Sequence, residues 1–314
     1  MRPSENIPLQ QSIMRTLLYF DLFRYPLRPD EIFRFLRTNG IAPPDLVEPL
    51  NDLVRRGHAF HHNGFYSARA EADLVTRRNA GNLTAQRMAG LAHRRGKLIG
   101  NFPFVRGVLA SGSFSKGYMD KDSDLDFFII TTPGRLWIAR MLIAIYKRVV
   151  FFNSHKYFCC NYFITSDHLE IEEKNLFTAT ELATLIPLCG ASCYERLMHE
   201  NHWIKKFYPN FQPAPTRRVP EAGMTMLKSV LEWLLSGSLG DKLSHKCRRL
   251  TARRWERLYS RQYPAADFSV AFKSSASVSK NHPNHYQRRV LERYEERLRE
   301  FSKKTFRLVP DTES

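Results

Sequence analysis

The sequence predicts an α+β protein, in which a small mixed sheet follows an N-terminal group of short helices and precedes a C-terminal helical region. Three observations lead to this prediction. Three short helical segments and a turn-linked hairpin are predicted over residues 1–70, strands alternate with helices over 71–173, and helical periodicity dominates 174–314. These ranges are the predicted domains.

The composition is that of a folded protein with polyanionic partners. The chain has 314 residues, of which 43% are hydrophobic and 25% charged, and this balance excludes wholesale disorder. Its 48 Lys and Arg against 31 Asp and Glu give a net charge of +17, which favours nucleic acid, nucleotides or an anionic membrane face. No apolar run reaches the roughly 18 residues of a membrane helix, and no signal peptide is recognisable. We expect a cytoplasmic protein without a membrane partner.

The first 70 residues predict a winged-helix pattern. Apolar residues at helical spacing predict a helix over 9–23 that Pro26 stops, a second that starts at Pro29, and a third over 44–56. The Asn63-Gly64 pair then predicts the tight turn of a hairpin.

The charge of this N-terminal part does not suit DNA reading. Its third helix carries Asp45, Glu48 and Asp52, and residues 1–70 hold nine Lys and Arg against seven Asp and Glu. Since acids repel phosphate, we expect this domain to pack on the rest of the chain or to bind a partner.

The middle part predicts a basic helix over 73–98, strands near 105–113, 123–131 and 156–165, and a helix over 137–152. Further helices are expected in four C-terminal segments: 178–188, 193–207, 224–237 and 286–301. A proline-rich linker is expected over 209–220.

One stretch, ASGSFSKGYMDKDSDLDFFIIT, combines groups that suit nucleotide chemistry. Asp124 and Asp126 alternate on a predicted strand, so their carboxylates are expected on one face, where a divalent cation would offset their repulsion. Gly112 lets the backbone approach a phosphate, to which the Ser113 hydroxyl donates. Gly117 is expected to keep the following loop near the same anion.

The order Gly112, Ser113, Asp124 and Asp126 resembles the motif of the nucleotidyltransferase superfamily, which includes relatives of DNA polymerase beta and the aminoglycoside nucleotidyltransferases. The resemblance covers about residues 104–165. It implies that the two acids are catalytic residues that hold Mg²⁺ or Mn²⁺. It also implies an NTP as substrate, and the residues expected to bind it are Gly112, Ser113, Lys116, Gly117 and Asn161.

The family generally has a third acid on a neighbouring strand, and this sequence departs from that pattern. On the predicted strand over 156–165 the polar residue in that place is Asn161. Either Asn161 fills the place, or Asp167, Glu170 or Glu172 reaches in, or the site binds nucleotide and turns over poorly.

Two functions follow from this reading. The first is a metal-dependent nucleotidyltransferase that moves a nucleoside monophosphate from an NTP to an acceptor that the sequence does not identify, nucleic acid being one candidate. The second is a nucleotidyltransferase-like domain with impaired chemistry that regulates or assembles on nucleic acid or another partner. Asn161 keeps the second function open.

A basic run over 242–261 has two readings. It holds eight Lys and Arg, flanked or interrupted by the acids Asp241 and Glu256, with Trp255 and Tyr259 between them. The run suits phosphate contact with base stacking, or it forms a solvated helix face with Trp255 packed inward.

Overall fold

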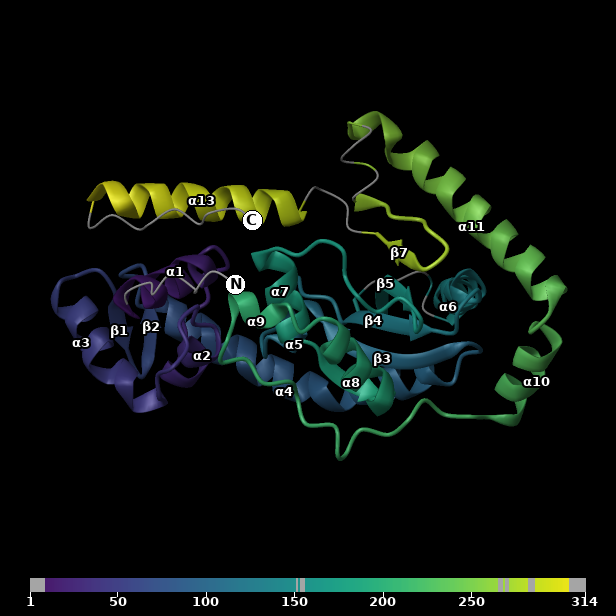
Figure 1. Cartoon of the computed structure of the whole chain (residues 1–314), viewed down its shortest axis with the longest axis horizontal. Helices are drawn as coiled ribbons and strands as arrows, with labels where there is room; N and C mark the ends of the chain where they lie inside the picture. The colour runs from purple at the N-terminus through teal and green to yellow at the C-terminus, as the bar shows by residue number, and fades with distance from the viewer. Residues whose placement is uncertain are drawn as a thin grey trace.

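The computed structural model describes residues 9–150, 152, 156–264, 268, 271–281 and 286–304. Figure 1 shows a helical N-terminal part at one end, a sheet with covering helices toward the other, and the long helix α13 across the N-terminal part. The α+β class predicted from the sequence is confirmed by this mixture of helices with a five-stranded and a two-stranded sheet.

The N-terminal part has its elements in the predicted order, three helical segments followed by a hairpin. Leu27 adds an isolated bridge to Tyr66 at the edge of this hairpin. Asn63 and Gly64 both have positive φ, as their turn requires. The elements are α1 (Leu9–Asp21), α2 (Pro29–Arg34), η1 (Pro43–Leu46), α3 (Val47–Arg55), β1 (Phe60–His62) and β2 (Phe65–Ser67).

The middle of the chain forms the centre of the large sheet. Strand β4 pairs antiparallel with β3 and parallel with β5, so the sheet is mixed. The elements are α4 (Asp73–Gly100), β3 (Val105–Ser111), α5 (Gly112–Ser115), β4 (Asp126–Thr131), α6 (Leu136–Val150) and β5 (Cys159–Thr165).

The region after residue 174 is not purely helical, which corrects the expectation. Two short strands, β6 (Ile186–Cys189) and β7 (Val278–Lys280), form the edges of the large sheet, in the order β6-β3-β4-β5-β7. Strand β6 holds Pro187, which an edge strand tolerates. A boundary at residue 173 therefore cuts through the sheet.

The helices of this region cover the sheet or extend beyond it. The expected helix over 193–207 is divided at Asn201, whose buried side chain accepts from the Ile171 amide and donates to the Leu169 carbonyl. The remaining elements are α7 (Leu176–Ala183), α8 (Ala191–Glu200), α9 (Ile204–Phe207), α10 (Met226–Leu234), α11 (Ser238–Tyr259), η2 (Ser260–Gln262) and α13 (Tyr286–Lys304).

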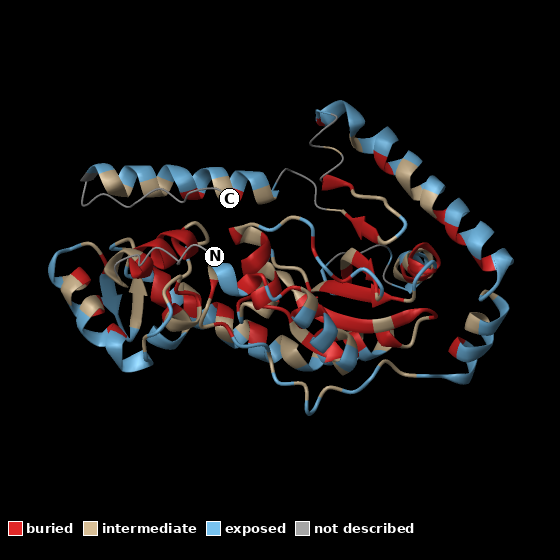
Figure 2. Ribbon diagram, viewed as in Figure 1, coloured by how far each residue is buried: buried red, intermediate tan, exposed pale blue. Residues whose placement is uncertain are grey.

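The two faces of the sheet are buried under different elements. On one face, Leu109 of β3, Ile130 of β4 and Ile164 of β5 belong to an apolar cluster with residues of α7 and α8. Residues of opposite parity, such as Val108 and Ile129, belong to a second cluster with α4, α6 and α11. Figure 2 shows both layers in red inside a largely pale-blue surface.

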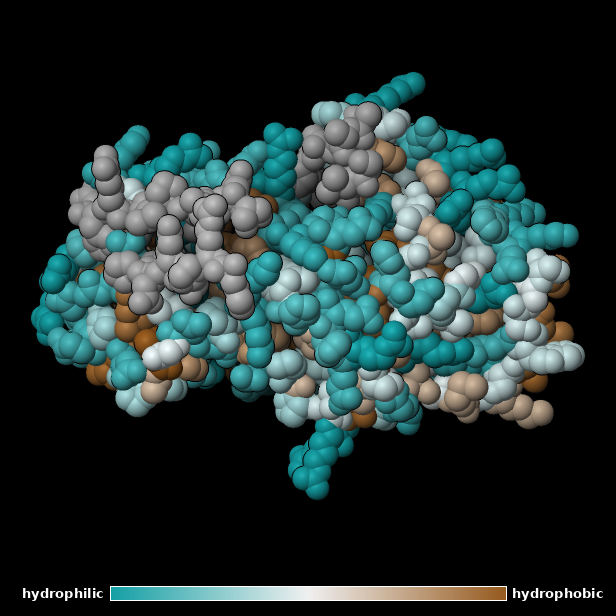
Figure 3. Space-filling model, viewed as in Figure 1, coloured by the Kyte–Doolittle hydropathy of each residue, from teal (hydrophilic) through white to brown (hydrophobic). Residues whose placement is uncertain are grey.

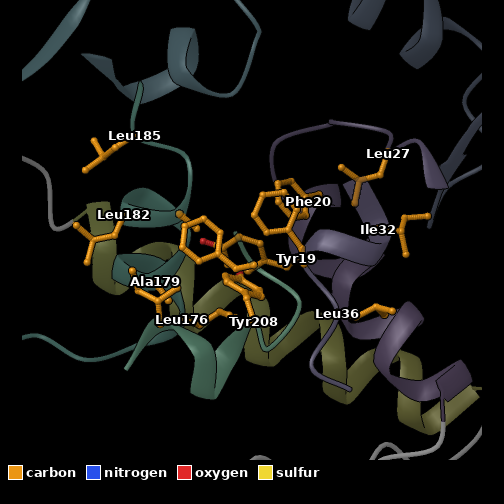
Figure 4. Close-up of a cluster of buried hydrophobic side chains, with 14 of the residues drawn as sticks. Tyr19, Phe20, Leu27, Ile32, Leu36, Leu176, Ala179, Leu182, Leu185 and Tyr208 are labelled. Atoms are coloured by element: carbon orange, nitrogen blue, oxygen red, sulfur yellow. The ribbon is translucent and has the colours of Figure 1, made fainter. Parts of the chain in front are cut away.

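The first cluster continues without a break into the N-terminal part. In Figure 4, Tyr19 and Phe20 of α1 lie close to Tyr208 and to the aliphatic side chains of α7, such as Leu176 and Ala179. Tyr294 of α13 packs edge-on against Tyr19, and its hydroxyl donates to the Arg15 carbonyl at 3.3 Å. The N-terminal part thus shares a core with the rest of the chain, as expected for a packing role.

No helix in the described part of the chain combines the length and the apolar composition needed to cross a bilayer.

Candidate active site

A cavity of about 490 Å³ lies where the N-terminal part meets the large sheet. Its floor is the segment that joins β3 to β4, together with the adjoining ends of β4 and β5. Residues of α1, α7 and α13 form the walls, and Tyr25 reaches in from the turn after α1. The predicted site residues Gly112, Ser113, Lys116, Asp126 and Asn161 all line this cavity.

Asp126 is the first residue of β4 and lies between Ser111 of β3 and Cys159 of β5. The pKa of its carboxyl is raised from 3.8 to about 6, mainly by burial and also by the charges of Asp124 and Glu181, whereas a hydrogen bond with Cys159 and the charge of Lys116 act to lower it. Asp126 makes no ion pair with Lys or Arg among the described residues. It is therefore a half-buried carboxylate without an ion-pair partner in that part of the chain, although the charge of Lys116 acts on it.

Gly112 makes room for this carboxylate. Its φ is +66°, and a Cβ placed there would lie 2.3 Å from Asp126 Oδ2. The backbone turn and the acid are thus in direct contact, although 14 positions separate them in the sequence.

Replacing Gly112 with Ala should move the carboxylate as well as strain the backbone. We expect a destabilisation of about 1–3 kcal/mol, measured by thermal unfolding, together with loss of metal-dependent nucleotide binding. Gly117→Ala is the matched control, because Gly117 has a φ of +71° with nothing within 4 Å of its would-be Cβ. Gly117→Ala should lower thermal stability through backbone strain but leave metal-dependent nucleotide binding intact. Equal losses of nucleotide binding in the two variants would contradict this account.

Asp124 does not lie where the strand alternation placed it. Strand β4 begins at Asp126, so Asp124 belongs to the preceding loop, is half-buried and lies outside the cavity lining. Its charge nevertheless raises the pKa of Asp126. The two acids are therefore electrostatic neighbours, but a shared strand face does not orient them.

Of the other residues predicted to bind phosphate, two line the cavity and one does not. Ser113 lies in the short helix α5 and lines the cavity, and so does Lys116 just after it. The Lys116 ammonium lies 2.9 Å from Glu181 and 3.1 Å from the Gly112 carbonyl oxygen. Gly117 turns the loop and does not itself line the cavity.

Asn161 occupies the place beside Asp126 where the third acid was sought. Its Nδ2 lies 3.4 Å from Asp126 Oδ1 and 3.0 Å from Cys159 Sγ. The acids considered as substitutes lie elsewhere. Glu170 pairs with Lys174, Glu172 pairs with Lys273, and Asp167 is exposed.

Three acids that the sequence analysis missed line the cavity: Asp120, Glu173 and Glu181. Glu181 is the sole charged residue of α7, and an isolated acid in an otherwise uncharged helix was an available signal. Glu173 lies 3.6 Å from Lys280. Burial lowers the pKa of the Lys280 ammonium, and the charge of Glu173 acts in the opposite direction.

Aromatic rings make up much of the remaining wall. Tyr162 stacks on Phe128 with ring centroids 4.7 Å apart, and Tyr25 meets Tyr118 edge-on. The guanidinium of Arg77 lies 4.8 Å above the Tyr118 ring and 3.7 Å from Asp120. The cavity thus has a polar floor and aromatic walls, an arrangement typical of small-molecule sites.

The floor fits a hard divalent cation that arrives with phosphate. No three His, Cys, Asp or Glu side chains group closely enough to hold a metal ion within the described ranges. Mg²⁺ commonly takes only one or two carboxylates and completes its shell with phosphate oxygens and water. The Asp126 carboxylate without an ion-pair partner among the described residues, the nearby charge of Asp124 and the glycine backbone in contact with Asp126 match that requirement.

The basic run over 242–261 forms most of α11 and lies away from the cavity lining. Trp255 is buried, packs edge-on against Trp137 and has the Arg140 guanidinium 4.9 Å from its ring. Tyr259 stacks on Phe272. Neither ring is free to stack on a base, so the inward-packed reading of Trp255 is confirmed.

Comparison of the chain with protein-family models, with curated proteins and with solved structures finds no match.

Proposed function

We propose that the protein is a metal-dependent nucleotidyltransferase, which transfers a nucleoside monophosphate from an NTP to an acceptor and releases pyrophosphate. The observation that supports this most is the Asp126 carboxylate, without an ion-pair partner in the described part of the chain, against the Gly112 turn in a cavity that Ser113, Lys116 and Asn161 also line. A carboxylate, a glycine turn and the Lys116 ammonium thus line one cavity, which supports binding of a metal with a phosphate there.

In this proposal Asp124 and Asp126 hold Mg²⁺ or Mn²⁺, and Asn161, whose Nδ2 now faces Asp126, would ligate through its amide oxygen once the side-chain amide turns over. When bound, the metal polarises the phosphoryl group and neutralises charge that develops during transfer. The Gly112 turn and the Ser113 hydroxyl hold phosphate oxygens by donating hydrogen bonds. Lys116 is at present paired with Glu181, and a phosphate that binds there exchanges one anionic partner for another.

The aromatic wall supports a nucleoside as the group that enters. The stacked pair of Phe128 and Tyr162, with Tyr118 and Tyr25 opposite, offers flat apolar surfaces beside the phosphate floor. Stacking on aromatic rings tolerates every base, so this wall favours a nucleoside without selecting one.

We propose that the N-terminal part is a winged helix that closes this site instead of reading DNA. Phe20, Phe23 and Tyr25 from this part line the cavity. The acids of its third helix are engaged locally: Asp52 pairs with Arg56 at 2.8 Å, and Glu48 pairs with Arg55 at the same distance.

The second candidate function is a nucleotide-binding module with impaired chemistry. Asn161 favours it, because an amide beside Asp126 adds no negative charge for the metal. Pyrophosphate release separates the two functions. We expect release from at least one of the four NTPs with Mg²⁺ or Mn²⁺ and with candidate acceptors that carry a hydroxyl. Metal-dependent nucleotide binding without any release would support the module instead.

A further inference from the structure

Helix α10 packs on the protein with its polar side chains. Lys228 is buried, and its ammonium donates to the carbonyl oxygens of Gly100 and Val105 at 2.9 and 2.8 Å. One turn later, Glu232 accepts from Arg106 at 2.7 Å and from the Phe104 amide. This polar face is therefore the attached face of the helix.

The opposite face of α10 is apolar and exposed. Met226 is 86% exposed, Trp233 75% and Leu227 68%, and Val230 and Leu234 are exposed with them. Met224 extends the same surface before the helix begins, again exposed. We call these six residues the α10 apolar face. Figure 3 shows white, tan and brown atoms around this end of the molecule, whereas most of the visible surface is teal.

The helix is held so that it cannot simply turn this face inward. Lys228 and Glu232 fix its body, and Arg135 fixes the turn that follows. The Arg135 guanidinium donates to the Leu235 carbonyl at 2.7 Å and pairs with Asp241 of α11 at 2.5 Å. Turning α10 about its axis would break these contacts and leave Lys228 and Glu232 without partners.

Helix α11 continues the surface with both apolar and cationic side chains. Leu239, Leu243 and Leu250 are exposed at helical spacing along it. Beside them stands a row of exposed bases: Lys242, Lys246, Arg249 and Arg253. The acid of the first turn, Asp241, is already paired with Arg135.

We propose that the α10 apolar face and the basic row of α11 dock on an anionic phospholipid surface. Leu, Met and Trp side chains enter the boundary between headgroups and acyl chains, and Lys and Arg pair with headgroup phosphates. This differs from the expectation of no membrane partner, which rested on the lack of a spanning segment and did not test for a surface contact.

Charge argues against the other occupants of this face. A second copy of the chain would bring a second cationic row against the first, and a helix of about nine residues is only about 13 Å long, short for the roughly 800 Å² per partner of a stable interface. Nucleic acid would satisfy the bases and leave the Leu and Met side chains in water. A lipid surface satisfies both.

The test uses the full chain with vesicles of phosphatidylcholine alone or with 30% phosphatidylserine. Of the four tryptophans, Trp137, Trp203 and Trp255 are buried, so Trp233 reports from the surface. We expect co-sedimentation with the anionic vesicles only, weakened by salt, with a blue shift of the emission and protection from acrylamide quenching.

Two variants examine the two halves of the surface. The apolar variant combines Val230→Ser with Leu234→Ser. The charge variant combines Lys242→Glu, Lys246→Glu and Arg249→Glu. Each variant should lower partitioning to anionic vesicles at least about tenfold. Leu83→Ser, at a half-exposed leucine of α4, is the control and should bind as the wild type does. Because these residues lie outside the cavity, nucleotide binding should not change.

The proposal is overturned if the wild type does not bind anionic vesicles, or if the variants bind as well as the wild type. Sedimentation of the protein alone provides the other decisive outcome: a dimer that Val230→Ser with Leu234→Ser dissociates would assign the face to a second copy. If the protein binds a nucleic-acid duplex but not vesicles, and if Val230→Ser with Leu234→Ser does not weaken that duplex binding, the basic row would be assigned to nucleic acid.

Discussion

Replacing Asp126 with Asn is expected to lower metal-dependent nucleotidyl transfer at least about a thousandfold, because a metal at a reacting phosphate supplies several kcal/mol. The variant should bind the metal–nucleotide complex poorly for the same reason. Activity at the wild-type level would contradict the proposed site.

The same substitution should stabilise the metal-free protein at neutral pH. Burial raises the pKa of Asp126 to about 6, so between pH 4 and 6 the native state binds more protons than the unfolded chain and stability falls as the pH rises. Removing the charge recovers up to about 3 kcal/mol at pH 7, measured by denaturant unfolding. Asp122→Asn, at an exposed acid of the same loop, is the control and should change neither property appreciably.

Replacing Asn161 with Asp is expected to act in the opposite direction. The new carboxylate would lie about where Nδ2 now stands, 3.4 Å from Asp126 Oδ1, so the metal-free protein should lose stability at pH 7.5 and recover it at pH 5. With Mg²⁺ and nucleotide present, the added charge should tighten metal binding about tenfold or more.

The control for Asn161→Asp is Asn175→Asp. Asn175 caps α7 by accepting from the Thr178 amide, a position where a carboxylate serves equally well. Metal affinity that stays unchanged in Asn161→Asp would show that Asn161 does not lie beside the metal, and Glu173 and Glu181 would then be the acids to test.

The parts of the site that depend on short stretches of sequence could be predicted. Gly112 follows an apolar strand directly, and Asp126 precedes one, so both could be placed at strand ends from the pattern alone. The Asn63-Gly64 turn and the N-terminal helices could also be predicted, because each depends on a short stretch of sequence. Asp124 was misplaced because the predicted strand over 123–131 began three residues before β4, within what is a loop in the structure.

The parts that depend on contacts between distant segments could not be predicted. Strands β6 and β7 have four and three residues, too few to show an alternation, and become strands only by pairing with β3 and β5. Glu181 reaches the cavity because α7 packs beside the sheet, which no local pattern reports.

Helix α10 shows a different limit of sequence reasoning. Its periodicity predicted a helix over 224–237, and the structure has one over Met226–Leu234, but sequence reasoning places an apolar face inward by default. Lys228 finds two buried carbonyl oxygens and Glu232 finds Arg106, and all three partners lie more than 120 residues away in the sequence. These contacts decide which face is attached.

The most direct test of the proposed site is a calorimetric titration of the four NTPs into the protein with and without Mg²⁺, because binding requires no knowledge of the acceptor. We predict metal-dependent binding to the wild type at pH 7.5, weaker binding at pH 5 where Asp126 is protonated, and no metal-dependent binding to Asp126→Asn. Binding that needs no metal, or that Asp126→Asn retains in full, would contradict the assignment of this cavity as a metal–nucleotide site.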